Sequence, residues 1–322
     1  MKAVAINGYG GPERLVLMDL PKPEPVAGEI LVRVYSAGVN PVDTKIRMGL
    51  LKNRIPNQFP LIPGWDAAGV VESVGPGVHR FKPGDEVYAY CRKPIIQHGT
   101  YAEYIALAES VVALKPVNLS FEESAAIPLA GLTAWQSLFD VAGLRAGQTV
   151  LVHAASGGVG GFAVQLARDR GAKVIATCSA GNADHVKKLG ADHVIDYTAQ
   201  DFREGVRHAV PGGVDVAFDT VGGDVQTRSA DCVRPGGILV SILAFTNEED
   251  IKVKGVIPRY HFVAPNAAQL EELAEMAEGE RLKVHLAAVL PLEQAAKAHE
   301  LIETRRTVGK IVLRVRPAIL PS

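Results

Sequence analysis

Short runs of alternating apolar and polar residues, separated by glycine and proline, fill roughly the first third of the chain. Residues 29–36 and 86–89 are two such runs, and Pro83 and Gly84 mark a turn just before the second. Alternation with a period of two places apolar side chains on one face of a strand. The pattern therefore predicts a mostly β domain, which we expect to cover residues 1–121.

The hydrophobic pattern changes near Ser120. Glu123 follows this serine by three positions, which is typical of a capping box at the start of a helix. Beyond it, stretches of helical periodicity alternate with short apolar runs at residues 150–152, 174–176, 194–196, 214–218 and 238–240. Such alternation predicts a doubly wound parallel sheet of the α/β class, here within residues 122–262.

Residues 263–322 form a third segment. Helical patterns cover residues 269–279 and 292–303, and a last strand is expected at residues 309–313. Because the parallel sheet already has its strands, we expect this segment to return to the first domain.

Composition argues against several classes of function. The 322 residues include 34 basic and 35 acidic side chains, so there is no basic excess to attract nucleic acid. The N-terminus lacks the apolar stretch of an export signal, and no uncharged apolar run reaches the roughly 18 residues of a membrane span. We therefore expect a cytoplasmic protein. Its three cysteines, without a Cys-x-x-Cys pair, are expected to be buried hydrophobic residues: Cys91, Cys178 and Cys232.

A glycine-rich turn follows the strand expected at residues 149–153. It contains Gly157, Gly158, Val159 and Gly160 and leads into a helix with one apolar face. Glycines let a pyrophosphate approach the amides at a helix N-terminus, where the helix dipole favours an anion. Ala155 replaces the first glycine of the usual G-x-G-x-x-G pattern, and a purely structural turn is the alternative, but strand, turn and helix together favour dinucleotide binding.

The residues after the second strand of the parallel sheet, expected at 174–176, indicate which dinucleotide the chain binds. A carboxylate at the end of this strand would hold both ribose hydroxyls of NAD, yet no acid lies between Asp169 and Asp184. Small hydroxyl residues there would accommodate a 2′-phosphate. We therefore expect NADPH, with NADH still possible.

Several catalytic patterns are missing from the sequence. Residues 1–121 contain one cysteine and only two histidines, His79 and His98, without metal-ligand spacing, so we expect no zinc or other metal. No tyrosine precedes a lysine by four positions, and no Gly-x-Ser-x-Gly elbow is present.

Four motifs occur in order along the chain: Asn-Pro-Val-Asp at 40–43, Pro-Gly-Trp-Asp at 63–66, the glycine turn, and Gly-Lys-Ile-Val at 309–312. Because these four motifs occur together, the chain resembles the zinc-independent quinone oxidoreductase branch of the medium-chain dehydrogenase/reductase superfamily. Within that branch it is close to the quinone reductases and the alkenal or enone reductases. The resemblance spans essentially the full length. It implies a GroES-like barrel, a Rossmann dinucleotide domain, and a cleft where nicotinamide and substrate meet.

The resemblance also implies roles for individual residues. Asn40 would lie beside the nicotinamide, Lys45 would contact the cofactor, and Ser179 to Asn182 would hold the 2′-phosphate. Alkenal reductases usually show a lysine where this chain has Asn182, so one charge-assisted contact worth about 1.5–3 kcal/mol is lost. Tyr197 matches a family tyrosine near the adenosine phosphate.

Structural alternatives stand beside these roles. Asn40 could cap a loop ahead of Pro41, and Lys45 could be a solvated surface charge. Thr133 could pack against the nicotinamide, in a catalytic position with Asn40, or bond a carbonyl of its own helix. Trp65, Asp66 and His153 are interpreted as structural. The remaining cofactor-binding candidates, which could instead be core residues, follow strands expected to line the cleft: Leu243, Phe245, Phe262 and Val263.

The expected reaction is hydride transfer from the nicotinamide to a quinone or to the C=C bond of an α,β-unsaturated carbonyl. Similar proteins are commonly homodimers, so a homodimer acting on a small molecule is expected. Two alternatives stay open: a non-catalytic NADPH-binding sensor, and an enoyl-thioester reductase or alcohol dehydrogenase of the same superfamily.

Overall fold

The computed structural model describes residues 1–317, which form two compact units. The first contains residues 1–129, 264–280 and the chain from Val284 onward, and the second contains residues 130–263 and 281–283. The boundary falls within helix α3 (Pro128–Trp135), later than the position expected from sequence. Helix α2 (Phe121–Ala125) explains the difference, because the Phe121 ring stacks on Tyr35 of the first unit with centroids 4.5 Å apart. The predicted capping box of Ser120 and Glu123 is confirmed at the start of α2.

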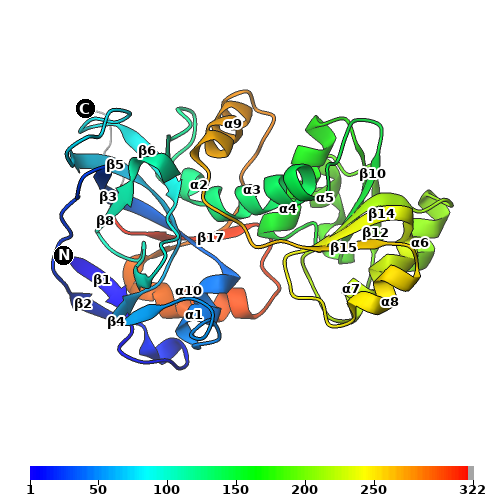
Figure 1. The fold of residues 1–322 in the computed structure, drawn as a ribbon, viewed down its shortest axis with the longest axis horizontal. Coiled ribbons are helices and arrows are strands. Elements are labelled where there is room, and N and C mark those ends of the chain that lie inside the picture. Colours follow the sequence, from blue (N-terminus) through cyan, green and yellow to red (C-terminus); the bar gives the residue numbers. More distant parts are fainter. Residues whose placement is uncertain (318–322) are drawn as a thin grey trace. The chain divides into compact units, whose positions relative to one another are not determined.

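The largest sheet of the first unit has seven strands (Figure 1). Its path runs β16-β17-β3-β5-β6-β9, and β8 also pairs with β3. The last strand pairs antiparallel with the first long one, so that Ile311 lies opposite Val39 and Leu313 opposite Ala37. The strands are β3 (Glu29–Val39), β5 (Asp66–Val74), β6 (Glu86–Tyr90), β8 (Tyr104–Ala108), β9 (Val112–Leu114), β16 (Leu286–Pro291) and β17 (Lys310–Arg314).

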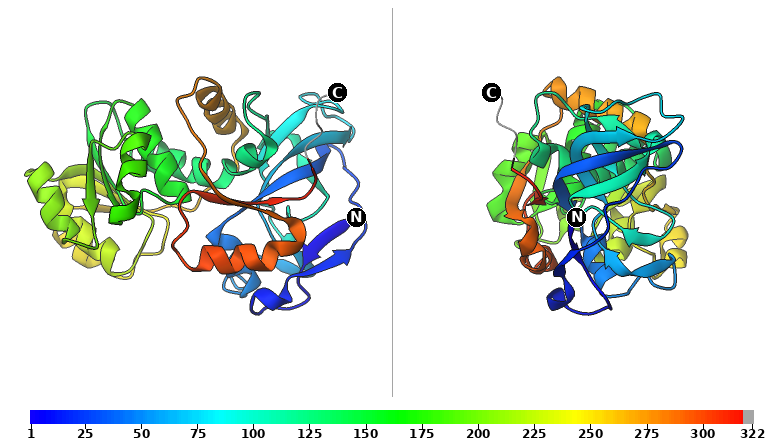
Figure 2. Two further views of the ribbon diagram at one scale, coloured as in Figure 1. Left: turned by 180° about the vertical axis from the view of Figure 1, so that it is seen from behind. Right: turned by 90° about the vertical axis from the view of Figure 1, so that its left-hand side faces the viewer.

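Smaller elements complete this unit. Strand β1 (Lys2–Ala5) pairs with β2 (Val16–Asp19), and β4 (Asn57–Ile62) pairs with β7 (Ile96–His98). Its other helices are α1 (Pro41–Arg47), α9 (Ala267–Glu278) and α10 (Ala295–Glu303). Ala295 and Ala298 of α10 share one buried cluster with Val4 and Leu313, so the C-terminal segment packs on the N-terminal strands (Figure 2).

The second unit is built on a six-stranded parallel sheet in the order β12-β11-β10-β13-β14-β15. Five of its strands were predicted. The sixth escapes the pattern because it is an edge strand interrupted by Pro258, which edges tolerate and centres do not. The strands are β10 (Thr149–Val152), β11 (Lys173–Cys178), β12 (His193–Asp196), β13 (Val214–Asp219), β14 (Val233–Ser241) and β15 (Ile257–Tyr260).

Helices cover both faces of this sheet. Helices α4 (Gly158–Asp169) and α5 (Ala183–Leu189) lie on one face. The opposite face carries α6 (Phe202–Ala209), α7 (Asp224–Ser229) and α8 (Glu248–Val253) (Figure 1). The strand order reverses between β10 and β13, and ligands of open α/β sheets bind outside the carboxyl ends of the strands at such a point. The predicted α/β fold with a doubly wound sheet is confirmed.

Two further features bear on the sequence predictions. All three cysteines are free thiols and are buried, as expected. Within residues 1–317, no helix combines the length and the apolar character that crossing a membrane requires.

Candidate active site

The glycine turn lies at the switch point of the second unit. Gly157 is the N-cap of α4, and the amides of Gly158, Val159 and Gly160 have no acceptor within the helix because they belong to its first turn. A Cβ on Gly160 would lie 2.3 Å from the carbonyl oxygen of Ala154, closer than any side chain tolerates. The turn therefore needs glycine at this position, and it presents amide donors at the positive end of a helix.

The chain beyond β11 closes on the same turn. The side-chain nitrogen of Asn182 donates to the hydroxyl oxygens of Ser156 and Ser179, at 3.2 Å each. The structure thus brings two of the predicted 2′-phosphate residues together with the glycine turn. Tyr197 follows β12 with 56% of its surface exposed.

A buried polar cluster fixes the loops after β13 and β14. One oxygen of Asp219 accepts the amides of Val221 and Gly222, both at 2.9 Å. Its other oxygen accepts the hydroxyl of Ser241 at 2.7 Å. The Ser241 hydroxyl in turn accepts the amide of Leu243 at 3.1 Å, which holds this predicted residue in place. Sequence reasoning missed Asp219 and Ser241, although a polar residue at the end of a buried strand is a usable signal.

His153, at the end of β10, is a packed residue, as interpreted from sequence. Its ring nitrogens lie 3.0 Å from the Thr177 hydroxyl and 2.8 Å from the Ser229 hydroxyl. Burial lowers the pKa of His153 to about 4, so the ring is neutral at physiological pH.

The other candidates of the second unit differ in exposure. Thr133 lies on α3 and is 3% exposed. Phe245 is half-buried against the sheet core, whereas Phe262 is 41% exposed and Val263 is 6% exposed. Phe245 packs against the sheet core, and the catalytic role of Thr133 and the cofactor roles of the other three residues stay predictions.

In the first unit, Asn40 is the N-cap of α1 and lies at the centre of a buried ionic cluster. Its side-chain nitrogen donates to Asp66 at 2.8 Å, and its side-chain oxygen accepts from the ammonium of Lys310. Lys310 also donates to the Val39 carbonyl at 3.1 Å and lies 3.7 Å from Asp66. Asn40 is 1% exposed, and its side-chain hydrogen bonds to Asp66 and Lys310 lock the amide in a single orientation.

A hydrogen-bonded chain continues from this cluster through Asp43. One Asp43 oxygen accepts the backbone amide of Asn40 at 2.8 Å and the hydroxyl of Tyr101 at 3.2 Å. Tyr101 lies 3.1 Å from Nε2 of His299, and Nδ1 of His299 faces the guanidinium of Arg47 at 3.3 Å. Because arginine can only donate, Nδ1 accepts and Nε2 carries the hydrogen. The other oxygen of Asp43 is buried with no hydrogen-bond partner among the described residues.

Burial dominates the electrostatics of this cluster. It raises the pKa of Asp43 to about 7, with repulsion from Asp66 adding to the rise, and it raises the pKa of Asp66 to about 6. Burial also lowers the pKa of Lys310, against the attraction of the two carboxylates. Two acids share one buried ammonium, so the cluster gains stability when one acid is protonated. Sequence reasoning assigned no role to Lys310, Tyr101 or His299, which come from distant segments.

Lys45 lies on α1 and is neither fully buried nor fully exposed. Burial and the nearby Arg305 both lower the pKa of Lys45. A partly desolvated ammonium near another cation gains from an anionic partner, as the cofactor role would require.

Comparisons with known proteins show which families the chain resembles. Residues 26–117 match the family model of the alcohol dehydrogenase GroES-like domain, and residues 189–313 match that of a zinc-binding dehydrogenase. A 2-methylene-furan-3-one reductase from Solanum lycopersicum is 35% identical over 98% of this chain and 80% of its own length.

Solved structures extend the likeness to three dimensions. An NADPH complex of Escherichia coli quinone oxidoreductase superposes with a TM-score of 0.89 at 32% identity, covering 98% of this chain and all of that one. An NAD-dependent alcohol dehydrogenase gives a TM-score of 0.90 at 37% identity, with the same coverage.

The zinc in the description of one family model does not fit the residues around Asn40. Zinc sites use thiolate, imidazole and carboxylate ligands. Here the Asp66 carboxylate is already committed to Asn40, to Lys310 and to the Leu129 amide at 2.8 Å. Burial raises the pKa of Cys91 well above its ordinary value, so this thiol is no thiolate. An ammonium, held by three oxygen atoms, provides the positive charge of this site.

Proposed function

Because the chain belongs to the medium-chain dehydrogenase/reductase superfamily, we propose that it is a zinc-independent, NADPH-dependent oxidoreductase that reduces a quinone or a conjugated C=C bond. The supporting observation is its likeness, over 98% of its length, to an NADPH-bound quinone oxidoreductase. A relative named for a methylene furanone, whose C=C bond is conjugated to a carbonyl, supports the second substrate class.

The second unit would hold the cofactor. Its glycine turn offers amide donors to the pyrophosphate, and the absence of a Cβ at Gly160 lets the start of α4 lie against the backbone of Ala154 and Ala155. Ser179, Ser156 and Asn182 present hydroxyl and amide groups, without a carboxylate, toward the 2′-phosphate. When bound, NADPH supplies the hydride.

Asn40 would bind the substrate through one side-chain N–H group. Its oxygen is committed to Lys310 and one amide hydrogen to Asp66, which leaves the second hydrogen on Nδ2 as a donor. A donor with fixed orientation stabilises negative charge on a carbonyl oxygen without reorganisation during the reaction. Lys310 and Asp66 are positioning residues in this scheme.

The direct test follows cofactor oxidation at 340 nm with NADPH or NADH, a small quinone or a simple enone, and a chelator present. Chelator-resistant turnover that prefers NADPH is expected, and the faster acceptor identifies the substrate class. Tight NADPH binding without turnover of either acceptor would contradict the proposal and favour a sensor. Turnover of alcohols with NAD alone would instead favour the activity named for the second structural neighbour.

An Asn40→Ala variant tests the residue. We expect a loss of about 100-fold in kcat, in the range measured for single oxyanion donors, with a smaller change in NADPH affinity. Asn7→Ala, at an exposed position, is the matched control. Unchanged kcat/KM and cofactor affinity in a folded Asn40→Ala protein would remove Asn40 from the mechanism.

We also propose a homodimer formed through the edge strand β15. Exposed apolar side chains occur on β15 and on α8, which packs against it: Tyr260 is 45% exposed and Val253 86%. An unpaired edge with apolar neighbours is suited to pairing with a second copy. Light scattering after gel filtration should give twice the chain mass, and Val253→Glu should shift the protein toward the monomer. A monomeric wild type at micromolar concentration would contradict this arrangement.

A further inference from the structure

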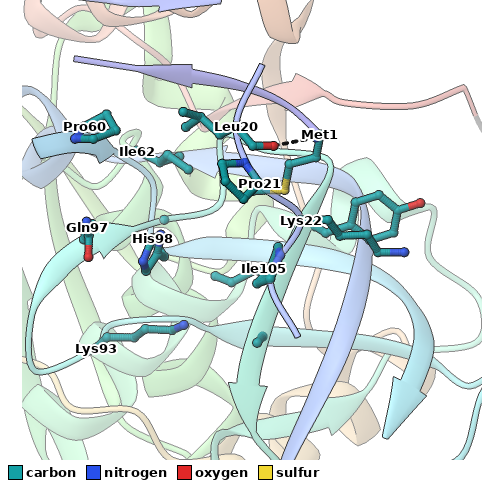
Figure 3. Close-up of a pocket in the computed structure, with 14 residues that line it drawn as sticks. Met1, Leu20, Pro21, Lys22, Pro60, Ile62, Lys93, Gln97, His98 and Ile105 are labelled. Atoms are coloured by element: carbon teal, nitrogen blue, oxygen red, sulfur yellow. Dashed lines mark hydrogen bonds between the residues drawn. The ribbon is translucent and has the colours of Figure 1, made fainter. Parts of the chain in front are cut away.

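A pocket of about 340 Å³ lies within the first unit, apart from the cluster around Asn40 (Figure 3). Its walls come from the chain at the end of β2 and from β4, β7 and β8. The apolar lining includes Leu20, Pro21, Pro60, Ile62 and Ile105. The volume is within the range of small-molecule sites, and such sites are mainly apolar with a few polar groups that fix the ligand.

The charged groups of this pocket are all basic. Lys22, Lys93 and His98 line it, and no aspartate or glutamate does. Lys22 is already neutralised, because its ammonium lies 3.0 Å from Glu72 and 4.0 Å from the centre of the Tyr104 ring. Lys93 differs, since within residues 1–317 its ammonium has no hydrogen bond or ion pair.

The surroundings of Lys93 favour an anion. Burial lowers the pKa of Lys93, and burial together with the nearby charge of Lys93 lowers the pKa of His98. The attraction of Glu29 opposes the fall in the pKa of Lys93, but Glu29 does not line the pocket and desolvation outweighs it, so this ammonium gains from an anion inside the pocket. Figure 3 draws the Lys93 side chain below His98, and both residues line the same pocket as Ile105.

We propose that this pocket is a second ligand site, which binds a small organic anion with an apolar body, such as a medium-chain carboxylate. The carboxylate pairs with the ammonium of Lys93, and the hydrocarbon part covers Pro21, Ile62 and Ile105. A charge-assisted hydrogen bond at the edge of an apolar cavity gives both affinity and selection for charge. The site is independent of the proposed reductase activity.

Titration calorimetry with octanoate and with the uncharged 1-octanol tests the proposal on the NADPH-free protein. The wild type is expected to bind octanoate at least tenfold more tightly than octanol, and Lys93→Gln should remove that difference while leaving octanol binding unchanged. Lys82→Gln, at an exposed turn outside the pocket, is the matched control and should bind like wild type.

Two results would overturn the site. One is equal affinity of the wild type for octanoate and octanol, and the other is unchanged octanoate affinity in a folded Lys93→Gln protein. Lys93→Arg retains the charge and should retain selection for octanoate, which separates loss of the ammonium from local damage. Turnover with NADPH, measured on the same variants, should stay at the wild-type rate, so failure of this proposal and failure of the reductase assignment are distinguishable.

Discussion

Replacing Asp43 with asparagine should make the protein more stable at high pH. Asp43 is fully buried, and one of its oxygens lacks a hydrogen-bond partner among the described residues. Burial raises the pKa of this carboxyl from 3.8 to about 7. The folded state therefore holds a proton that the unfolded chain has already released, and stability falls as the pH rises from about 4 to about 7. Asparagine keeps the shape and the acceptor oxygen but carries no charge.

The magnitude follows from the pH interval. Between pH 5 and the folded pKa of about 7, each pH unit costs the wild type about 1.4 kcal/mol that the variant does not lose. The stability of Asp43→Asn relative to wild type should therefore rise by about 3 kcal/mol between pH 5 and pH 9. Taking the difference between two pH values removes any pH-independent effect of the substitution.

Urea unfolding followed by tryptophan fluorescence measures this difference. The chain has two tryptophans, Trp65 in the first unit and Trp135 in the second. In a Trp135→Phe background, the buried Trp65, whose ring centre lies 6.1 Å from that of Tyr90, reports on the first unit alone. Asp19→Asn, at a side chain that is 82% exposed, is the control and should show no comparable trend. A pH-independent difference between Asp43→Asn and wild type would refute the reasoning.

Three further predictions concern other residues. Gly160→Ala, whose methyl group would lie 2.3 Å from a carbonyl oxygen, should abolish measurable NADPH binding, whereas Gly161→Ala, with its nearest neighbour at 3.4 Å, should bind NADPH in fluorescence titrations. Asn182→Lys should tighten NADPH binding by about 10- to 100-fold and leave NADH unchanged, because a 2′-phosphate gains a charge-assisted partner; equal effects on both cofactors would count against that placement. The folded protein should not react with Ellman's reagent, because all three thiols are buried and burial raises the pKa of Cys232 to about 12; rapid labelling of any thiol would disprove this.

The sequence predicted most of the second unit because its signals are local. Each strand of the parallel sheet except β15 contains a short apolar run, and the glycine turn is recognised from adjacent residues. Strand β16 was missed because it carries no local signal of this kind. Its residues show no alternation between buried and exposed positions, and its place is set by pairing with β17 rather than by its own pattern.

The ionic cluster of the first unit was beyond local reasoning. Asn40 was recognised from its motif, but the lysine that fixes its amide is 270 positions away. Nothing in the spacing of Tyr101 and His299 indicates that they meet, because their contact depends on how α10 packs on the strands of the first unit. Long-range packing decides such contacts, whereas periodicity reports only which face of an element is apolar.

Strand β17 also has a consequence for how the chain is made. Synthesis begins at the N-terminus, so β3 and the acids Asp43 and Asp66 leave the ribosome long before Lys310 does. Until Lys310 is synthesised, β3 lacks its neighbour β17, and the two carboxylates have no ammonium to balance their charge when they are buried. A nascent chain cannot bury these carboxylates in the first unit without a large desolvation cost. The last strand therefore couples completion of translation to burial of the acids, and a chain terminated before Lys310 would keep them hydrated and remain open to proteases.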